Sequence, residues 1–157
     1  ALDFGVPKET ITRTIPKIQF EGRVQYITKG RLKRLLKPNE KLLIDGCHSI
    51  ASAKNLYNYL KTLKEPVYGI WGMQKNKLPD QFIKSFQNIF KKVVTLTIPN
   101  EPNAMKAENL KSIAEKYIRT DKVSNIETAL RKLSSKEKKT IVVFGSLYLV
   151  GDVLKKN

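Results

Sequence analysis

Short apolar runs alternate along the chain with longer segments in which apolar residues recur every three or four positions. The short runs predict β-strands and the periodic segments predict amphipathic helices. The predicted strands are residues 23–28, 41–45, 66–71, 93–98 and 140–144, with a weak one near 122–123. The predicted helices are residues 50–63, 80–90 and 106–117, a segment from a cap at Ser124 to Leu133, and a last one from Ser146 to about Leu154.

Two N-terminal stretches differ from this alternation. Val6-Pro7-Lys8-Glu9 predicts the start of a short helix, because proline is favoured in the first turn, and Pro16 requires this helix to end by Ile15. Residues 29–37 contain a glycine and five positive charges. This composition predicts an exposed hairpin or insertion.

Strands that alternate with helices in this way predict one α/β domain, and a length of 157 residues suits a single domain. Residues 140–144 form a continuous β-branched run, as expected of a central parallel strand that is buried on both faces. The predicted fold class is a Rossmann-like three-layer α/β domain, with a mostly parallel sheet and helices on both faces. Such sheets bind ligands at the carboxyl ends of their strands, so functional residues are expected in the loops that follow strands.

Composition and charge narrow the class of protein. The chain is 41% hydrophobic and 28% charged, which predicts a packed, soluble domain. It has 30 Lys and Arg residues against 14 Asp and Glu residues, a net charge of +16 that attracts polyanions. The lysines accompany many Ile and Asn residues, as in AT-rich coding sequences, and Arg is not interleaved with aromatic residues. A nucleic-acid partner is therefore not expected.

Cysteine content and hydropathy indicate the cellular compartment of the protein. A single cysteine excludes an internal disulfide, and no Cys/His cluster suggests zinc. No run approaches the roughly 18 apolar residues of a membrane span, and the first residues lack the order of a signal peptide. A cytoplasmic protein is expected.

Three loops that follow predicted strands carry glycine beside polar side chains: Asp45-Gly46-Cys47-His48-Ser49, Gly69 to Lys77, and Gly145-Ser146. Glycine permits a tight turn or the close approach of a ligand, and the free N–H groups of the following helix favour an anion. The sequence contains neither G-x-x-x-x-G-K-[ST] nor G-x-G-x-x-G, so no complete nucleotide cradle is present. An anionic ligand shared with another domain is therefore expected.

The polar side chains of the first of these loops have both functional and structural interpretations. Asp45 suits hydrogen bonds to a ribose, a contact to a metal-held water, or a helix cap. His48, the single histidine, suits proton transfer or contact with a phosphate or carboxylate, with a structural role as the alternative. Cys47 has no second histidine that would orient a Cys/His pair, so a nucleophilic thiol is not expected.

Further candidates lie in the other loops. Lys77 offers a point charge to a phosphate, and Arg23 offers a guanidinium fork to a phosphate or carboxylate; solvated surface is the alternative for both. Ser146 suits a helix cap and a carboxylate contact, and the two roles are compatible. Trp71 is expected in the core.

Five motifs occur in a fixed order along the chain: Glu21-Gly22-Arg23, Asp45-Gly46-Cys47-His48-Ser49, Gly72-Met73 with Lys77, Glu101-Pro102, and the block from Val142 to Gly151. In this order they resemble the folylpolyglutamate synthase/dihydrofolate synthase family of the Mur ligase superfamily. The match covers essentially the whole chain, as the C-terminal domain of that family. The D-G-x-H motif and the final block are the most specific parts.

This resemblance implies an ATP-dependent carboxylate-amine ligase with two domains. In that family ATP phosphorylates the carboxylate of folate or dihydropteroate, and the amino group of glutamate attacks the acyl phosphate to give an amide. The N-terminal domain holds the P-loop, the Mg²⁺ ligands and much of the pterin site, whereas the C-terminal domain closes over ATP and helps to bind glutamate. Residues 1–19 would then be the tail of the N-terminal domain with the linker, and residues 20–157 the glutamate-ligase domain. The chain alone is expected to be inactive.

By the same resemblance Arg23 and Asp45 correspond to nucleotide contacts, and His48 and Ser146 correspond to positions that face glutamate or the transferred phosphate. His48 and Lys77 are the candidate catalytic residues, and no metal ligand is expected in this chain. The expected partners are the N-terminal ATP-binding domain of the same protein, glutamate, and folate or dihydropteroate. A monomer is expected, and the start at Ala1 rather than Met agrees with an upstream domain.

Several positions depart from the family's pattern. Where the family has Trp-Pro, this chain has Phe20-Glu21, and where the family has D-G-A-H-N-P, this chain has Asp45-Gly46-Cys47-His48-Ser49-Ile50. The family's Asp-Lys-Asp is replaced by Asn76-Lys77-Leu78, and its Pro-Arg by Pro102-Asn103. A guanidinium and two carboxylates are therefore lost. Two alternatives stay open: a degenerate, non-catalytic ligase-like binding module, and a basic nucleic-acid-binding domain.

Overall fold

A computed structural model describes residues 5–14 and 21–157 and contains one six-stranded sheet in the order β1-β2-β6-β3-β4-β5. β1 pairs with β2 in antiparallel fashion, and every other neighbouring pair is parallel, which confirms the predicted mostly parallel sheet. The strands are β1 (Gln25–Ile27), β2 (Glu40–Asp45), β3 (Val67–Trp71), β4 (Phe90–Thr95), β5 (Thr120–Lys122) and β6 (Lys139–Phe144).

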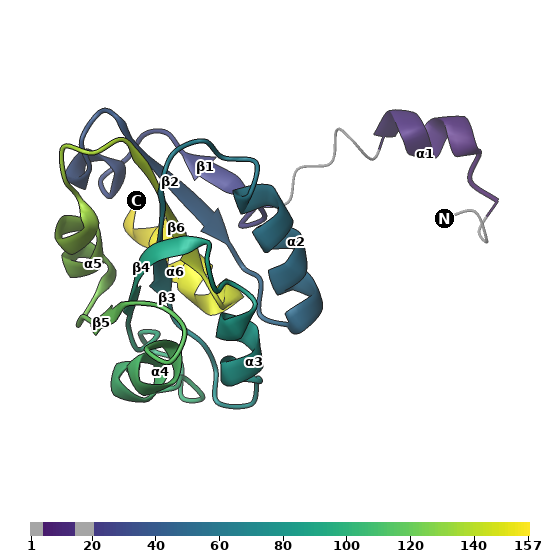
Figure 1. Cartoon of the computed structure of the whole chain (residues 1–157). Helices are drawn as coiled ribbons and strands as arrows, with labels where there is room; N and C mark the ends of the chain where they lie inside the picture. Colours follow the sequence, from purple (N-terminus) through teal and green to yellow (C-terminus); the bar gives the residue numbers. More distant parts are fainter. Residues whose placement is uncertain (1–4, 15–20) are drawn as a thin grey trace.

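Helices cover both faces of the sheet, as Figure 1 shows. α2, α3 and α4 pack on one face, while α5, α6 and the loop around the 3-10 helix η3 pack on the other. The helices are α1 (Lys8–Thr14), η3 (Lys33–Leu35), α2 (Ile50–Leu60), α3 (Pro79–Lys84), α4 (Ala107–Ala114), α5 (Ile126–Leu133) and α6 (Leu147–Lys156). The predicted three-layer α/β fold is confirmed.

Side chains of the central strands alternate between two apolar cores. Ile141 and Val143 of β6 contribute to the core beneath α5 and α6, whereas Val142 and Phe144 contribute to the core beneath α2, α3 and α4. All four are 0% exposed, as expected of a central strand with helices on both sides. Trp71 is likewise 0% exposed, which confirms its predicted place in the core.

Several predicted boundaries are wrong. α3 ends at Lys84 instead of residue 90, because the chain continues in tighter turns in which Phe86 N–H donates to Ile83 O, so the apolar spacing outlasts the helix. Phe90, predicted on that helix, is the first residue of β4. The cap of α5 is Asn125 instead of Ser124, since its side chain accepts a hydrogen bond from Thr128 N–H at 2.8 Å.

The predictions for the residues before β2 are confirmed only in part. Residues 29–37 form a loop with the 3-10 helix η3, so of the predicted exposed hairpin or insertion the hairpin is wrong, and two of its residues, Leu32 and Leu36, are buried in the core instead of exposed. α1 agrees with the predicted short helix, whereas its predicted limit at Ile15 and the domain boundary at residues 19 and 20 lie outside the described residues. No helix within residues 5–14 and 21–157 combines the length and apolar character that crossing a bilayer requires.

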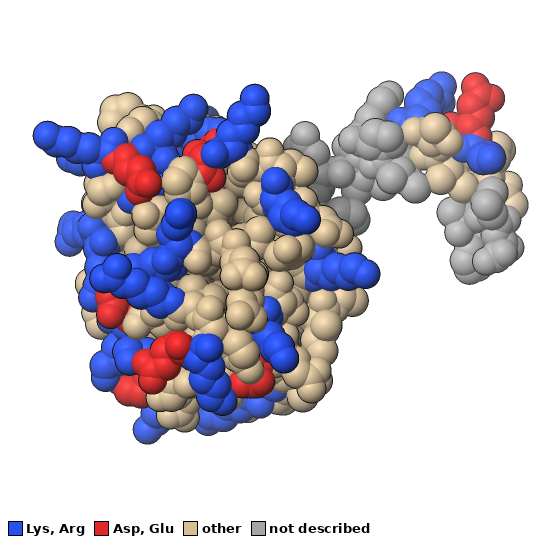
Figure 2. Space-filling view, viewed as in Figure 1, with Lys and Arg blue, Asp and Glu red and all other residues tan. Residues whose placement is uncertain are grey.

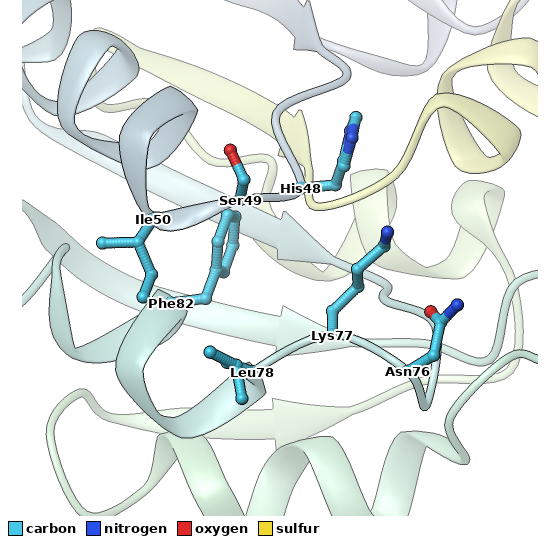
Figure 3. A pocket seen from close by; sticks show the side chains of 7 residues that line it. All are labelled: His48, Ser49, Ile50, Asn76, Lys77, Leu78 and Phe82. Atoms are coloured by element: carbon cyan, nitrogen blue, oxygen red, sulfur yellow. The ribbon is translucent and has the colours of Figure 1, made fainter.

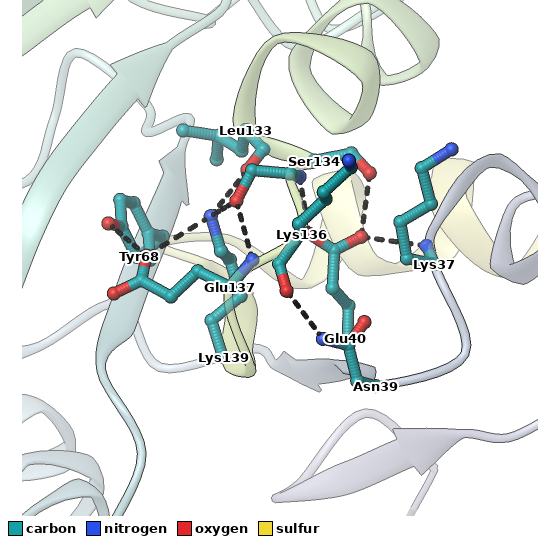
Figure 4. Close-up of polar contacts among 10 residues, drawn as sticks. Lys37, Asn39, Glu40, Tyr68, Leu133, Ser134, Lys136, Glu137 and Lys139 are labelled. Atoms are coloured by element: carbon teal, nitrogen blue, oxygen red, sulfur yellow. Dashed lines mark hydrogen bonds and ion pairs between the residues drawn. The ribbon is translucent and has the colours of Figure 1, made fainter.

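A buried polar network closes the amino-terminal edge of the sheet (Figure 4). Glu40, at the start of β2, is 1% exposed, and its carboxylate accepts hydrogen bonds of 2.6–2.8 Å from Lys37 N–H, Ser134 Oγ and Ser135 N–H. Lys139, at the start of β6, is 3% exposed and donates to Leu133 O at 3.0 Å and Ser135 Oγ at 2.7 Å. The network thereby satisfies two buried charged groups.

Positive charge covers much of one face of the molecule. Figure 2 shows Lys and Arg side chains mainly along its left, upper and lower parts, with Asp and Glu beside several of them, whereas its centre and right side are mostly uncharged. Salt bridges at the surface include Lys41–Glu65 at 2.6 Å and Lys122–Glu108 at 2.6 Å.

Candidate functional site

The three loops singled out by the sequence meet at the carboxyl ends of β2, β3 and β6. Asp45, the last residue of β2, pairs in register with Phe144 of β6, which pairs in turn with Trp71 of β3. Residues 46–49, 72–77 and 145–146 follow these strands directly. The turn at residues 21–24 joins them, because Gln25 of antiparallel β1 pairs with Ile44. We call these four segments the carboxyl edge.

Glycines allow the loops of the carboxyl edge to approach one another closely. Gly145 has a φ of +106°, and a Cβ there would lie 2.5 Å from Gly72 O and 2.5 Å from Trp71 Cδ1. A Cβ on Gly46 would lie 2.2 Å from Leu147 Cδ2. Only glycine combines this conformation with this spacing, so the predicted role of Gly145 at a tight turn is confirmed.

Asp45 joins two of these segments. The residue is 5% exposed; its Oδ2 accepts a hydrogen bond from Val24 N–H at 2.9 Å and its Oδ1 accepts one from Cys47 N–H at 2.8 Å. Gly46 N–H also donates to Gly22 O at 2.7 Å. Arg23 lies between Gly22 and Val24 in this turn and is exposed, so the predicted strand start at residue 23 is wrong: β1 begins at Gln25.

His48 is held by its own loop. Its Nδ1 lies 2.9 Å from Gly46 O. Because a carbonyl only accepts, Nδ1 carries the hydrogen in this contact, and Nε2 is the nitrogen left for a ligand. The next residue, Ser49, forms a capping box with Ser52 that begins α2. The half-buried His48 ring is therefore fixed directly before a helix N-terminus.

His48 and Lys77 line the same cavity, which has a volume of about 380 Å³ (Figure 3). Figure 3 shows Lys77 extending its amine towards the loop that carries His48. Phe82 of α3 also lines the cavity. The cavity thus places an imidazole and an ammonium group above an apolar wall, an arrangement suited to a carboxylate or phosphate with an apolar attachment.

Ser146 caps the last helix, as predicted. It is 2% exposed, and its Oγ accepts a hydrogen bond from Tyr148 N–H at 3.1 Å. The first turn of α6 therefore begins at the carboxyl edge with its remaining free N–H groups directed out of the helix. The buried hydroxyl of Ser146 supports the helix end more directly than it offers a contact to solvent.

Cys47 is buried between these loops and is 0% exposed. Burial raises the pKa of its thiol well above the usual range, the charge and hydrogen bond of Asp45 add to the rise, and Gly145 N–H and Arg23 oppose it. A protonated, inaccessible thiol is a poor nucleophile, which agrees with the sequence-based expectation. The turn that carries Arg23 lies beside the 45–47 loop, because Val24 N–H donates to Asp45 Oδ2.

Exposed apolar side chains surround the same edge. Within residues 5–14 and 21–157, the large hydrophobic residues that are more than a third exposed are Val24, Ile50, Leu78, Leu147 and Tyr148. Each lies in one of the four carboxyl-edge segments or within two residues of its end. Clustered exposed apolar residues mark interaction surfaces, so this edge has the character of an interface.

The described residues do not provide a metal centre. Among them, no group of three or more His, Cys, Asp or Glu side chains is arranged to hold an ion.

Comparison with known families identifies the domain. Residues 28–156, most of the chain, match the family model of the dihydrofolate synthetase C-terminal domain. The chain belongs to this family. No curated protein matches its sequence significantly. This membership confirms the family resemblance that the sequence indicated for this dihydrofolate synthetase C-terminal domain.

Solved structures of larger enzymes share the fold. The domain resembles the folylpolyglutamate synthase of Mycobacterium tuberculosis complexed with ADP and AMPPCP, with a TM-score of 0.75 and 19% identity over 97% of this chain and 36% of that chain. The folylpolyglutamate synthase of Thermotoga maritima gives 0.72 and 24% over 96% and 34%. The bifunctional folylpolyglutamate synthase/dihydrofolate synthase of Yersinia pestis complexed with AMPPNP and Mn ion gives 0.75 and 21% over 96% and 34%. The chain spans about a third of the length of these proteins.

The structure brings all five candidate residues of this dihydrofolate synthetase C-terminal domain to one edge, but these residues differ in how far their side chains are exposed to solvent. Arg23 is exposed and His48 and Lys77 are half-buried, whereas Asp45 and Ser146 are buried in internal hydrogen bonds. Sequence reasoning did not single out Val24, Gln25 or Ser52, which shape the loops. Only Ser52 had a detectable signal, since it completes a capping box with Ser49.

Proposed function

We propose that this chain is the C-terminal domain of an ATP-dependent ligase that adds glutamate to folate or dihydropteroate through an acyl phosphate. The observation that carries the proposal is the convergence of Arg23, His48 and Lys77 at the carboxyl edge of a domain from the dihydrofolate synthetase family. Among solved structures of larger relatives with the same fold, one is described with ADP and another with Mn, AMPPNP and L-glutamate. Because open α/β sheets bind ligands at the carboxyl ends of their strands, this edge suits such anionic substrates.

Each accessible cation suits one anion of this reaction. The exposed Arg23 guanidinium suits an oxygen of the ATP phosphates, on the nucleotide side that also includes Asp45. Lys77 suits the transferred phosphoryl group or the carboxylates of the incoming glutamate. In the neutral ring His48 Nε2 is free to accept a proton from the glutamate ammonium, and the imidazolium ion that results suits the same anions. Ser146 fixes the N-terminus of α6 beside them.

The apolar rim gives this edge a second role. We infer that an N-terminal ATP-binding domain of the same protein, which also supplies the P-loop and the Mg²⁺ ligands, closes against Val24, Ile50, Leu78, Leu147 and Tyr148. Closure would exclude water from the acyl phosphate and bring the cations onto the phosphoryl group. The chain alone is accordingly expected to be inactive and to bind ATP weakly. We place the ligase in the cytoplasm as a monomer.

An assay of the full-length protein tests this function. ADP release is measured with glutamate and with either dihydropteroate or folate as acceptor. His48→Ala and Lys77→Ala are each expected to lower kcat/KM by about a hundredfold, in the range found for the loss of one preorganised polar contact to a transition state. Lys64→Ala, at an exposed position in the loop before β3, removes an equal charge and is expected to have no effect. Wild-type rates in both site variants, or no glutamate addition by the intact protein, would refute the proposal.

A further inference from the structure

The Arg23 turn has an unfavourable backbone conformation. Val24 has a φ of +45° and Gly22 a φ of +73°, so Arg23 lies between two residues with positive φ. For glycine this conformation carries little strain, but for a β-branched residue such as Val24 it is a true outlier. Strained residues of this kind persist only where surrounding contacts determine their conformation.

Three hydrogen bonds supply these contacts. Asp45 Oδ2 accepts one from Val24 N–H at 2.9 Å, Gly22 O accepts one from Gly46 N–H at 2.7 Å, and Gln25 Oε1 accepts one from Gly22 N–H at 2.7 Å. The other oxygen of Asp45 accepts from Cys47 N–H at 2.8 Å. One buried carboxylate thus ties the Arg23 turn to the loop that continues into His48.

We propose that Asp45 is a positioning residue for Arg23. Its carboxylate holds Val24 in the left-handed conformation, which presents the Arg23 guanidinium at the carboxyl edge. Both Asp45 oxygens already accept protein hydrogen bonds and the side chain is 5% exposed, so its influence on nucleotide binding passes through Arg23. This inference rests on the proposed function, in which Arg23 contacts the ATP phosphates.

A double-mutant cycle in the full-length protein tests the inference. The dissociation constant of AMPPNP with Mg²⁺ is measured for the wild type, Arg23→Ala, Asp45→Asn and the double variant. We expect each single variant to bind about tenfold more weakly and the double variant to bind no more weakly than Arg23→Ala, because residues that act as a unit are not additive. Independent effects that multiply to about a hundredfold would overturn the inference while leaving the proposed function intact. Unchanged affinity in both single variants would refute the nucleotide role of this edge as well.

Two further variants separate positioning from a general loss of structure. Val24→Gly in the Asp45→Asn background removes the strain that Asp45 opposes, so it is expected to restore at least about half of the lost affinity on a logarithmic scale. If Asp45 had a merely structural role, or contacted the nucleotide directly, no such rescue would be expected. A lack of rescue by Val24→Gly would therefore contradict the inference. Gln25→Ala loosens the same turn without changing charge, and its effect should likewise vanish in the Arg23→Ala background. This variant keeps the test valid if Asp45→Asn fails to fold.

Discussion

Gly145→Ala tests how tightly the loops of the carboxyl edge are packed. The new Cβ would lie 2.5 Å from Gly72 O and 2.5 Å from Trp71 Cδ1, and neither atom is the free end of a flexible side chain. A side chain at a φ of +106° adds backbone strain. Strain of this kind costs roughly 1–3 kcal/mol and overpacking about 1–3 kcal/mol. We therefore expect the free energy of unfolding to fall by about 2–6 kcal/mol.

Urea unfolding measures this loss directly. Trp71 is the single tryptophan and lies against Gly145, so its fluorescence reports on the site, while circular dichroism reports on the whole domain. Gly151→Ala is the matched control, because a Cβ there meets no atom within 4 Å and Gly151 lies inside α6. The control should gain up to about 1 kcal/mol from helix propensity. An unfolding free energy for Gly145→Ala within about 0.5 kcal/mol of the wild type would refute the packing argument.

Three further predictions concern the remainder of the domain. Cys47 should react with a thiol reagent such as DTNB only as the protein unfolds, because its side chain is 0% exposed and its thiol pKa is raised by burial. Glu40→Ala should lower the free energy of unfolding by about 2–4 kcal/mol in urea titrations, since it leaves part-buried donors without an acceptor, whereas exposed Lys138→Ala should change it little. The pKa of Glu65 is lowered chiefly by its hydrogen bond with Lys41, so this stabilisation is present above the unfolded pKa and is lost as the pH falls through the folded pKa. Urea midpoints measured from pH 7 down to pH 3 should accordingly decrease less steeply for Lys41→Gln than for the wild type.

Each of these predictions has a clear contrary result. Rapid modification of Cys47 in the native protein would show that the 45–47 loop is open. Equal effects of the Glu40 and Lys138 substitutions would show that the network in Figure 4 contributes no more than surface charge. Identical acid profiles for the wild type and Lys41→Gln would show that the ion pair between Lys41 and Glu65 is screened by solvent.

The pattern of apolar residues was sufficient for the architecture. Residues 141–144 are apolar without interruption, a pattern that predicts helices on both faces, and β6 lies at the centre of the sheet. Element boundaries were harder to predict where the helical spacing of apolar residues continued beyond the last residue of the helix. Phe82, Phe86 and Phe90 keep a helical spacing, yet they belong to a helix, a turn and a strand, because tertiary packing and not the spacing decides where α3 ends.

The candidate site was predictable to the level of the loop and not of the side chain. Glycine beside polar residues after a strand indicated the loops that contain His48, Lys77 and Ser146, and the structure brings these loops to one edge of the sheet. The sequence could not show that Asp45 is buried with both oxygens accepting backbone hydrogen bonds, because its partner Val24 lies 21 residues away. Positive φ at Val24 was equally invisible, since a β-branched residue is the least expected choice for that conformation.

The central claim is that the carboxyl edge faces ATP and glutamate. Amide hydrogen exchange of the full-length protein, with and without AMPPNP, Mg²⁺ and glutamate, tests it without any substitution. The account predicts slower exchange in residues 21–24, 46–50, 72–78 and 145–148, and unchanged exchange at the opposite end of the sheet in residues 61–66 and 134–138. Protection confined to the opposite end, or none at the carboxyl edge at saturating ligand, would contradict the account.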